Sequence, residues 1–461
     1  MYHKSIDKII LPVIEQNMNN DLENSLGDSL RPPTEAGLKW LFLDLNSYFA
    51  SVEQNENRSL MGKPVAVVPM MTDATCAIAA SYEAKAFGIK TGTKIYDAKK
   101  MCPELICIKA CHKKYVDYHH RIIAATEKII PVHKIWSVDE FDCLLLGRER
   151  TPENATDLAN RIKAQLHKDV GPAINCSIGI GPNSFLAKVA TEIQKPDGLV
   201  ILDPKNLPGR LLDLKLTDLP GINVAMLKRL NLCGIKNMEQ LYNTSPKQAR
   251  AIWRSVQGER FWYWLHGYDV PYVTTNPSMI GHSRMLDPSL RGCEKTRQMG
   301  RRLLFKACSR MRRRDLYAKN LVIKLRFLNG SKWATYRDFP ASQDPFTMMK
   351  LFNDMWHQME QECFNGAIPP SNNKMIFLKV STLLNGLCNK DEITNDLFEQ
   401  KIIENSDKIQ KQKKLADAMN SLQEKYKTET VWLGVTPTTL AGDVGTKIAF
   451  NRVPKKEEFW E

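Results

Sequence analysis

Two acidic positions interrupt apolar, strand-like stretches of this sequence. Asp44 lies near the end of KWLFLDL, and Asp139 and Glu140 lie side by side within IWSVDEFDCLLL. Adjacent residues of a strand point to opposite faces, so one acid of the pair faces the interior unless the strand ends or twists there. Carboxylates gathered at strand ends repel one another, which raises their pKa values. Because Mg²⁺ prefers oxygen ligands and removes this repulsion, the pattern predicts a metal site; surface acids paired with nearby Lys or Arg are the alternative.

The chain is long and basic. At 461 residues it is too long for a single core and suggests about three domains or more. Lys and Arg number 65 against 51 acids, a net charge of +14, which favours nucleic acid as a partner over an acidic membrane. We find no apolar run of about 18 residues and no apolar signal-peptide core at the N-terminus. These features predict a cytoplasmic protein without a membrane partner.

The 11 cysteines are scattered without a CxxC pair, which is typical of a reducing compartment. One cluster resembles a metal site: Cys102, Cys107, Cys111 and His112. Its spacing fits no common zinc module, and Cys107 lies in the apolar run LICIKA. Buried thiols are therefore favoured over zinc.

The expected elements change in character along the chain. Up to about residue 206, strand-like runs such as PVAVVP and INCSIGIG are mixed irregularly with helical patterns such as SFLAKVATEIQ, which indicates an α+β core. Short helices separated by turn residues follow from about residue 207. After a linker rich in Pro, Thr and Asn (271–279), LVIKLRFL and KMIFLKVS predict strands of another mixed unit. A charged helix pattern occupies residues 400–426.

A second group of residues has the chemistry to bind phosphates. Tyr82 and Lys85 in SYEAKAFGIKTG are three residues apart, so they share one face of a helix. Lys195 follows much later, in IQKPDG. Lysine ammonium groups act as point charges on triphosphate oxygens. A solvated surface lysine is the alternative for each.

Five motifs together resemble a known family. DLNSYFASVE, SYEAKAFGIKTG, WSVDEF, SIGIGPNSFLAKVA and QKPDG occur in the order and at the spacing of the Y-family (translesion) DNA polymerases, and the bacterial polymerase IV or V types are the most similar. The resemblance covers roughly residues 38–388. It implies an α+β right-hand architecture with a palm (37–47 and 111–206), small fingers (48–110), a helical thumb (207–270), the linker (271–279) and an α/β little finger (280–388). Outside it, residues 1–36 are polar and rich in Asn, Asp and Glu, which predicts a weakly ordered N-terminal extension, and residues 389–461 form a C-terminal extension.

The resemblance assigns roles to the acids. It implies that Asp44, Asp139 and Glu140 bind two Mg²⁺ ions together with the backbone carbonyl of Leu45. Two such ions activate a 3′-hydroxyl and stabilise a departing pyrophosphate. Asn46 stands where many polymerase IV types have Asp, as it does in polymerase V types, so the expected metal site is unaffected.

The same resemblance defines a nucleotide site. Phe49 matches the steric gate, whose ring would lie under the sugar and exclude a ribose 2′-hydroxyl, and Tyr48 lies beside it. Tyr82, Lys85 and Lys195 match the positions that hold the incoming triphosphate. Lys85 stands where Arg is usual. A lysine keeps the charge but loses the bidentate fork of arginine, which weakens the expected nucleotide binding.

Two segments are expected to contact DNA. LPGINVAMLKRLNLCGI resembles a helix-hairpin-helix element that offers backbone amides to phosphate; Gly221 forms its tight turn and Asn223 replaces a second glycine, since Asn tolerates left-handed geometry. Residues 291–326 carry thirteen Lys or Arg against two acids. In RRLLFKACSRMRRR, apolar residues at helical spacing predict one packed face. The other face is solvated or, by resemblance, contacts template and primer backbones through Arg301, Arg302, Arg310, Arg312 and Arg313.

A short C-terminal peptide, NDLFEQ, resembles a sliding-clamp-binding motif with Leu397 and Phe398 as its hydrophobic pair. Thr394 stands where such motifs usually begin with Gln, and a short helix packed on the domain is the alternative.

The expected activity is template-directed, error-prone DNA synthesis past damaged bases by a monomer that uses primer–template DNA and dNTPs. Small fingers imply an open site with low fidelity and low processivity. The alternatives are a catalytically silent relative that acts as a scaffold in a mutagenesis complex, and a non-enzymatic hairpin DNA-binding protein. The presence of all three acids argues against both.

Overall fold

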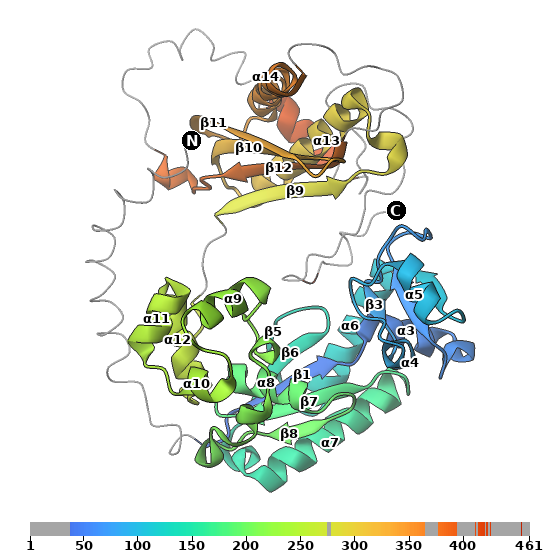
Figure 1. The fold of residues 1–461 in the computed structure, drawn as a ribbon, viewed down its shortest axis with the longest axis vertical. Helices are drawn as coiled ribbons and strands as arrows, with labels where there is room; N and C mark the ends of the chain where they lie inside the picture. Colours follow the sequence, from blue (N-terminus) through green and yellow to red (C-terminus); the bar gives the residue numbers. More distant parts are fainter. Residues whose placement is uncertain are drawn as a thin grey trace. The chain divides into compact units, whose positions relative to one another are not determined.

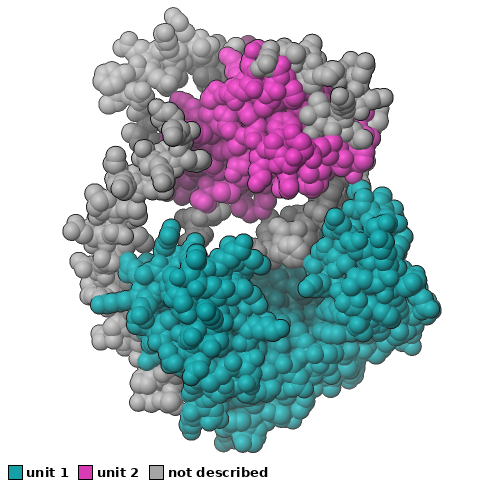
Figure 2. Space-filling model, in the orientation of Figure 1, with its two compact units in different colours: residues 1–272, 446–459 teal, residues 273–445, 460–461 magenta. Residues whose placement is uncertain are grey.

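A computed structural model describes residues 37–273, 278–364 and 377–393, with several helical positions between residues 411 and 425, and Val453. The chain divides into two compact units (Figure 2), residues 1–272 with 446–459 and residues 273–445 with 460–461. We describe each unit by itself. None of the helices in these ranges has the length and apolar character needed to cross a bilayer.

The centre of the first unit is a five-stranded sheet (Figure 1). Its order is β5 (Val132–Ile135), β6 (Glu140–Leu144), β1 (Trp40–Leu45), β7 (Cys176–Gly181) and β8 (Leu199–Ile201). The strand pairs are antiparallel except β7 and β8, which are parallel. The α+β class predicted from the sequence is confirmed, since strands and helices are mixed without a regular βαβ repeat.

Different helices pack against the two faces of the sheet. Leu41, Leu43 and Leu45 of β1 belong to a core with α6 (His112–Glu127) and α7 (Pro152–Asp169). Alternate residues of a strand point the opposite way, so Phe42 and Asp44 face α8 (Ser184–Ile193). Burying each large apolar side chain contributes about 1.5–3 kcal/mol, so the leucine face fixes the register of β1. Asp44 is thereby held on the α8 face.

Two glycines let α8 lie close to that face. Gly179 and Gly181 pair with Phe42 and Trp40 across the β1–β7 ladder. A Cβ on Gly179 would lie 2.0 Å from the backbone oxygen of Ala187, and one on Gly181 would lie 3.0 Å from its nitrogen. Only glycine fits such an approach. The IGIG segment of β7 therefore brings α8 onto the sheet.

The segment after β1 contributes first to the core of the large sheet and then forms a small sheet with a core of its own. Helix α3 (Tyr48–Glu56) packs its apolar residues into the core of the large sheet, although the resemblance places the start of the fingers at residue 48. A separate small sheet follows, in the order β3 (Ala79–Ala80), β2 (Val65–Val68) and β4 (Ile106–Lys109), with its own core. Helices α4 (Tyr82–Ala86) and α5 (Ile95–Met101) accompany it.

Short helices complete the first unit, as the sequence predicts from residue 207. They are α9 (Val224–Leu232), α10 (Met238–Tyr242), α11 (Pro246–Trp253) and α12 (Val256–Leu265). The side chain of Asn183 donates to the carbonyls of Trp264 and Tyr268 at 2.8 and 2.9 Å, and Lys39 forms an ion pair with Asp269. These bonds tie the end of α12 to the sheet.

The second unit is a four-stranded antiparallel sheet with two long helices on one face (Figure 1). The order is β11 (Lys332–Ser342), β10 (Ala318–Phe327), β12 (Phe377–Asn385) and β9 (Met279–Met285). Helices α13 (Cys293–Arg312) and α14 (Pro345–Phe364) share one core with alternate residues of the strands. A Cβ on Gly300 would lie 2.6 Å from the ring of Phe352, so glycine allows the two helices to pack closely.

Candidate active site

The three predicted acids meet at the ends of two neighbouring strands. Asp44 of β1 lies directly opposite Glu140 of β6 in the antiparallel ladder, and Asp139 immediately precedes β6. The N–H of Leu45 donates to the carbonyl of Asp139 at 2.9 Å, which holds the two chain segments together. The expectation that these acids converge therefore agrees with the strand register.

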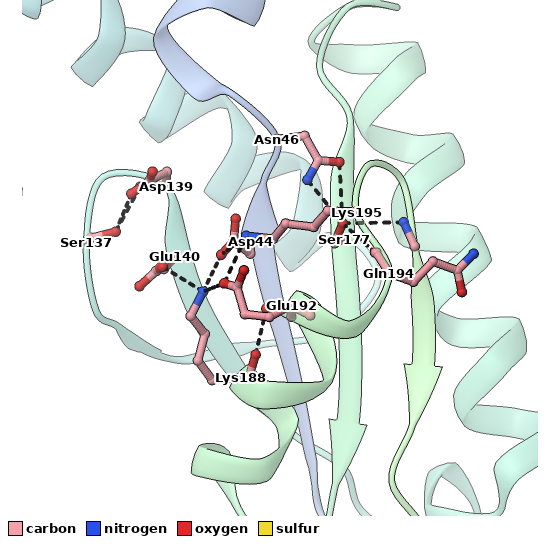
Figure 3. Close-up of polar contacts among 12 residues, drawn as sticks. Asp44, Asn46, Ser137, Asp139, Glu140, Ser177, Lys188, Glu192, Gln194 and Lys195 are labelled. Atoms are coloured by element: carbon pink, nitrogen blue, oxygen red, sulfur yellow. Dashed lines mark hydrogen bonds and ion pairs between the residues drawn. The ribbon is translucent and has the colours of Figure 1, made fainter. Parts of the chain in front are cut away.

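Two lysines and a further glutamate complete what we call the carboxylate cluster (Figure 3). Lys188 Nζ forms ion pairs with Asp44, with Glu140 at 2.8 Å and with Glu192 at 2.8 Å. Lys195 Nζ pairs with Asp44 at 3.0 Å and with Glu192 at 2.9 Å. The carboxylates of Asp44, Glu140 and Glu192 thus surround the two ammonium groups, and Asp139 pairs with neither lysine in these contacts.

Sequence reasoning missed Lys188 and Glu192. The available signal was a lone lysine in the apolar segment SFLAKVA, with an acid four residues later on the same helical face. A long charged side chain in an otherwise buried helix face needs a partner of opposite charge. Lys188 is only 15% exposed, and its other two partners, Asp44 and Glu140, come from strands that the sequence does not place beside α8.

The pKa values of the acids shift in different directions. Burial favours a raised pKa for Asp44, but the charges of Lys188 and Lys195 outweigh it and lower the pKa. The pKa values of Asp139 and Glu140 are raised, mainly by burial and further by the charge of Asp44, while Ser137 and Lys188 oppose these shifts. The prediction of raised values is therefore wrong for Asp44, because the lysines compensate its charge.

The donor set fits a hard divalent cation in its chemistry. Three carboxylates offer the oxygen ligands that Mg²⁺ prefers. Within the described ranges, no three His, Cys, Asp or Glu side chains already surround one point. Asp139 accepts a hydrogen bond from Ser137, and Figure 3 shows it apart from the carboxylates around Lys188. The positive charge that the acids need is here supplied by the two lysines.

The cysteines and histidine considered for zinc do not surround a common point either, within the described part of the chain. Cys102 is buried, Cys107 and Cys111 are half-buried, and all 11 cysteines are free.

The predicted phosphate-binding residues lie beside the carboxylate cluster. Lys85 Nζ lies over the ring of Tyr82, 4.3 Å from its centroid. The pKa of Lys85 is lowered, first by burial and then by the charge of Lys195, against the opposing charge of Asp44. Burial, with the charges of Asp44 and Glu192, raises the pKa of Tyr82 to about 12. These couplings place α4 within electrostatic reach of β1 and α8.

The two aromatic residues at the start of α3 are buried. Phe49 is 8% exposed and stacks on Tyr115, with ring centroids 4.2 Å apart. Tyr48 is 3% exposed, and its hydroxyl donates to the backbone carbonyl of Tyr115 at 2.6 Å. The hydroxyl of Tyr48 is therefore engaged within the fold.

The tight turn expected at Gly221 in LPGINVAMLKRLNLCGI forms and leads into α9, but Asn223 has a different role from the one expected. Gly221 adopts φ +92°, a left-handed conformation that favours glycine. Asn223 is extended, with φ −85° and ψ 177°, and its side chain accepts from the N–H of Met226 at 2.9 Å. The left-handed role expected of Asn223 is wrong; this residue is the N-cap of α9.

The basic helix also differs from expectation. Its apolar stripe is buried as predicted, at Met299, Leu303, Ala307 and Met311. Arg302, however, is only 7% exposed, so the prediction that it lies on an open face is wrong. Arg301, Arg310 and Arg312 are half-buried and Arg313 is exposed. Arg302 lies next to the apolar stripe on α13, which explains its burial.

A basic surface that the sequence analysis did not single out lies on the sheet face opposite α13 and α14. Leu321, Ile323 and Leu325 of β10 belong to the helix-covered core, so the alternate residues point away from it. Arg326 pairs with Lys332 of β11 and with Lys379 of β12. We call this surface the basic sheet face; its members are Lys324, Arg326, Lys332 and Lys379. The signal was the alternation of apolar and basic residues in LVIKLRF.

The clamp-like pair Leu397 and Phe398, and the extension 1–36, lie outside the described residues.

Comparison with known proteins gives a consistent result. The model of the impB/mucB/samB family matches residues 43–192, and the model of the C-terminal domain of that family matches residues 277–397. DNA polymerase IV of Moorella thermoacetica is 33% identical over 55% of this chain and 64% of its own length. DNA polymerase IV of Pelotomaculum thermopropionicum is 36% identical over 44% of this chain and 50% of its own. The matched part therefore spans half to two thirds of these relatives.

The fold is similar to a solved structure, a Y-family DNA polymerase chimera. The similarity covers 76% of this chain and 99% of the other, with a TM-score of 0.61 and 19% sequence identity. The right-hand polymerase fold expected from the resemblance is thereby confirmed.

Proposed function

Because the chain belongs to the impB/mucB/samB family of Y-family translesion DNA polymerases, we propose that it is a template-directed DNA polymerase that copies past damaged bases. The observation that carries this proposal is the register of β1 and β6, which opposes Asp44 and Glu140 beside Asp139. A scaffold or a simple DNA-binding protein has no need of buried acids held in this way. The phosphate-binding residues beside them supply the other half of a nucleotide site.

Asp44, Asp139 and Glu140 would hold the Mg²⁺ ions, with the carbonyl of Leu45. When bound, two such ions activate the primer 3′-hydroxyl and stabilise the leaving pyrophosphate. The low pKa of Asp44 keeps its carboxylate ionised and ready to bind a cation. Glu192 pairs with both lysines and would still offer them a carboxylate if Asp44 and Glu140 held a cation.

The incoming dNTP is bound through its triphosphate by Lys85 and Lys195. Tyr82, whose pKa is about 12, stays protonated at neutral pH and donates a hydrogen bond. Lys at position 85 interacts as a point charge instead of a bidentate fork. The ring of Phe49 lies under the sugar and excludes a ribose 2′-hydroxyl. Small fingers leave the site open, which gives low fidelity and low processivity.

DNA is bound through phosphates. The Gly221 turn and the N-terminus of α9 offer backbone N–H groups, and the basic sheet face and the outer arginines of α13 offer charge. Such contacts are independent of sequence and weaken as salt rises. The protein acts as a monomer, and residues 394–400 add a weak clamp-binding peptide.

Primer extension tests the proposal. With Mg²⁺, dNTPs and a primer–template that carries an abasic site, the wild type should extend past the lesion, and Asp139→Asn should lose about 1,000-fold or more in rate. Asp157→Asn, at a side chain that is 69% exposed on α7, is the matched control and should extend normally. A wild type that does not extend favours the scaffold, and an Asp139→Asn variant that extends fully would remove Asp139 from the catalytic acids.

A further inference from the structure

The ring assigned to the sugar gate has one dominant neighbour. Phe49 and Tyr115 stack with ring centroids 4.2 Å apart and planes 12° apart. The rings of Tyr48 and His112 are farther from Phe49, at 5.7 and 6.4 Å, and more steeply inclined. Stacked rings gain dispersion and electrostatic energy only while they stay in register. The position of the Phe49 ring therefore depends on that of Tyr115.

Tyr115 is fixed at two points. Its hydroxyl donates to Glu53 Oε1 at 2.9 Å, and its backbone carbonyl accepts from the Tyr48 hydroxyl at 2.6 Å. The side chain is fully buried. Burial and then the charge of Glu53 raise the pKa of the phenol, so it remains a donor at neutral pH. Rotating the ring would leave a buried carboxylate without this donor, which is costly.

Glu53 connects Tyr115 with the helix that carries Phe49. It lies four residues after Phe49 on α3, so both side chains leave the same face of the helix. Glu53 is 5% exposed, and its second oxygen, Oε2, accepts from Lys114 Nζ at 2.8 Å. Lys114 and Tyr115 are consecutive residues of α6. One helix thus supplies the gate and the carboxylate, and the other supplies both partners of that carboxylate.

We propose that Glu53 is a positioning residue for sugar selection. Through the hydroxyl of Tyr115, it holds the plane against which Phe49 stacks, and so sets how strongly the site excludes ribonucleoside triphosphates. The inference rests on the proposed function, because it takes Phe49 as the gate. Glu53 acts through Tyr115 and does not itself contact the nucleotide.

A similar pair on the same two helices provides a matched control. Tyr118 donates its hydroxyl to Glu56 Oε1 at 2.6 Å, one turn along α6 from Tyr115. The ring of Tyr118 faces the guanidinium of Arg121, 4.6 Å from its centroid. Tyr118→Phe therefore removes the same kind of bond between α3 and α6 and leaves the stack of Phe49 intact.

The experiment measures kcat/KM for dNTP and for rNTP incorporation in the full chain with Mg²⁺ and an undamaged primer–template. Tyr115→Phe and Glu53→Gln should lower the dNTP/rNTP ratio by about three- to tenfold, the effect of losing part of one charge-assisted hydrogen bond. The loss should arise mainly from a lower KM for rNTP. Tyr118→Phe should keep the wild-type ratio, and Phe49→Ala should lose the most selectivity.

The inference is overturned if Tyr115→Phe and Glu53→Gln keep the wild-type ratio while Phe49→Ala loses it. If the wild type extends but Phe49→Ala keeps its selectivity, the gate assignment and this inference both fall, and the polymerase proposal stands. A wild type without extension overturns the proposed function itself.

A readout without catalysis uses the cycle of Phe49→Ala, Tyr115→Phe and the double variant in chemical denaturation. The two stability losses should be non-additive; additive losses would contradict the positional coupling.

Discussion

In the first unit, charges of opposite sign are buried against one another, whereas in the second unit charges of one sign lie side by side on an open sheet face. The carboxylate cluster depends on register, since Asp44 faces Glu140 only if the β1–β6 ladder is in place. The basic sheet face depends only on the alternation of residues along β10. Buried pairs are costly to break, and exposed like charges act weakly and additively. We therefore expect single substitutions to have large effects in the cluster and small ones on the face.

The largest effect on stability is expected at Lys188. Its ammonium compensates three carboxylates, so Lys188→Met should lower the free energy of unfolding by about 3 kcal/mol in EDTA, as for one partner removed from a buried ion pair. Mg²⁺ should reduce this loss, because a bound ion then compensates the same acids. Chemical denaturation with and without Mg²⁺ measures both quantities.

Lys163→Met is the matched control for this experiment. Lys163 is 14% exposed, close to the 15% of Lys188, but it pairs with a single, half-exposed acid, Asp197, at 3.0 Å. Its stability loss should be smaller and should not change with Mg²⁺. Equal responses of the two variants would show that the acids around Lys188 have no special need of a cation.

The contrast between the units also explains how far the sequence could predict the site. Asp44, Asp139 and Glu140 were identifiable because acids inside apolar runs violate the strand pattern. The lone lysine in SFLAKVA indicates that Lys188 needs a partner, but the identity of its strand partners depends on Gly179 and Gly181, which let α8 approach the sheet. Close approach between elements distant in sequence is a property of packing, and no local pattern reports it.

In the second unit, too, the sequence did not predict which charged residues are exposed. Charge density along residues 291–326 favoured the arginines of α13, but density does not say which face of a helix is covered. Arg302 lies next to the apolar stripe of α13 and is buried with it. The alternating residues of β10 are a better guide, because the period of a strand separates its two faces directly.

A pH-dependent effect is expected in the second unit. Burial, and then the charges of Lys306 and Arg310, lower the pKa of His282 to about 4 from its usual 6.5. The unfolded chain binds a proton at this residue more readily, so stability is complete above pH 6.5 and is lost as the pH falls towards 4. His282→Gln should flatten this loss in denaturation experiments between pH 7.5 and 4.5. His357→Gln, at a side chain that is 62% exposed, should leave the wild-type profile, and equal profiles for all three proteins would reject the assignment.

The smallest effects are expected on the basic sheet face. Lys324→Ala or Arg326→Ala should weaken binding of primer–template DNA uniformly across sequences, and each should reduce the slope of log Kd against log salt by about one. Fluorescence anisotropy across a salt series measures the slope. Lys99→Ala is the control, since Lys99 is paired with Asp73 at 2.7 Å in the first unit. An unchanged slope in the Lys324 and Arg326 variants would remove this face from the DNA interface.

The proposed function requires that the acids at the β1–β6 strand ends bind divalent ions. Mn²⁺, as a paramagnetic substitute for Mg²⁺, can be titrated into the full chain and followed by electron paramagnetic resonance. The wild type should bind the ion, Asp44→Asn and Asp139→Asn should each weaken binding by about tenfold or more, and Asp157→Asn should bind normally. Equal binding by all four proteins, or none by the wild type, would show that these acids do not form a metal site.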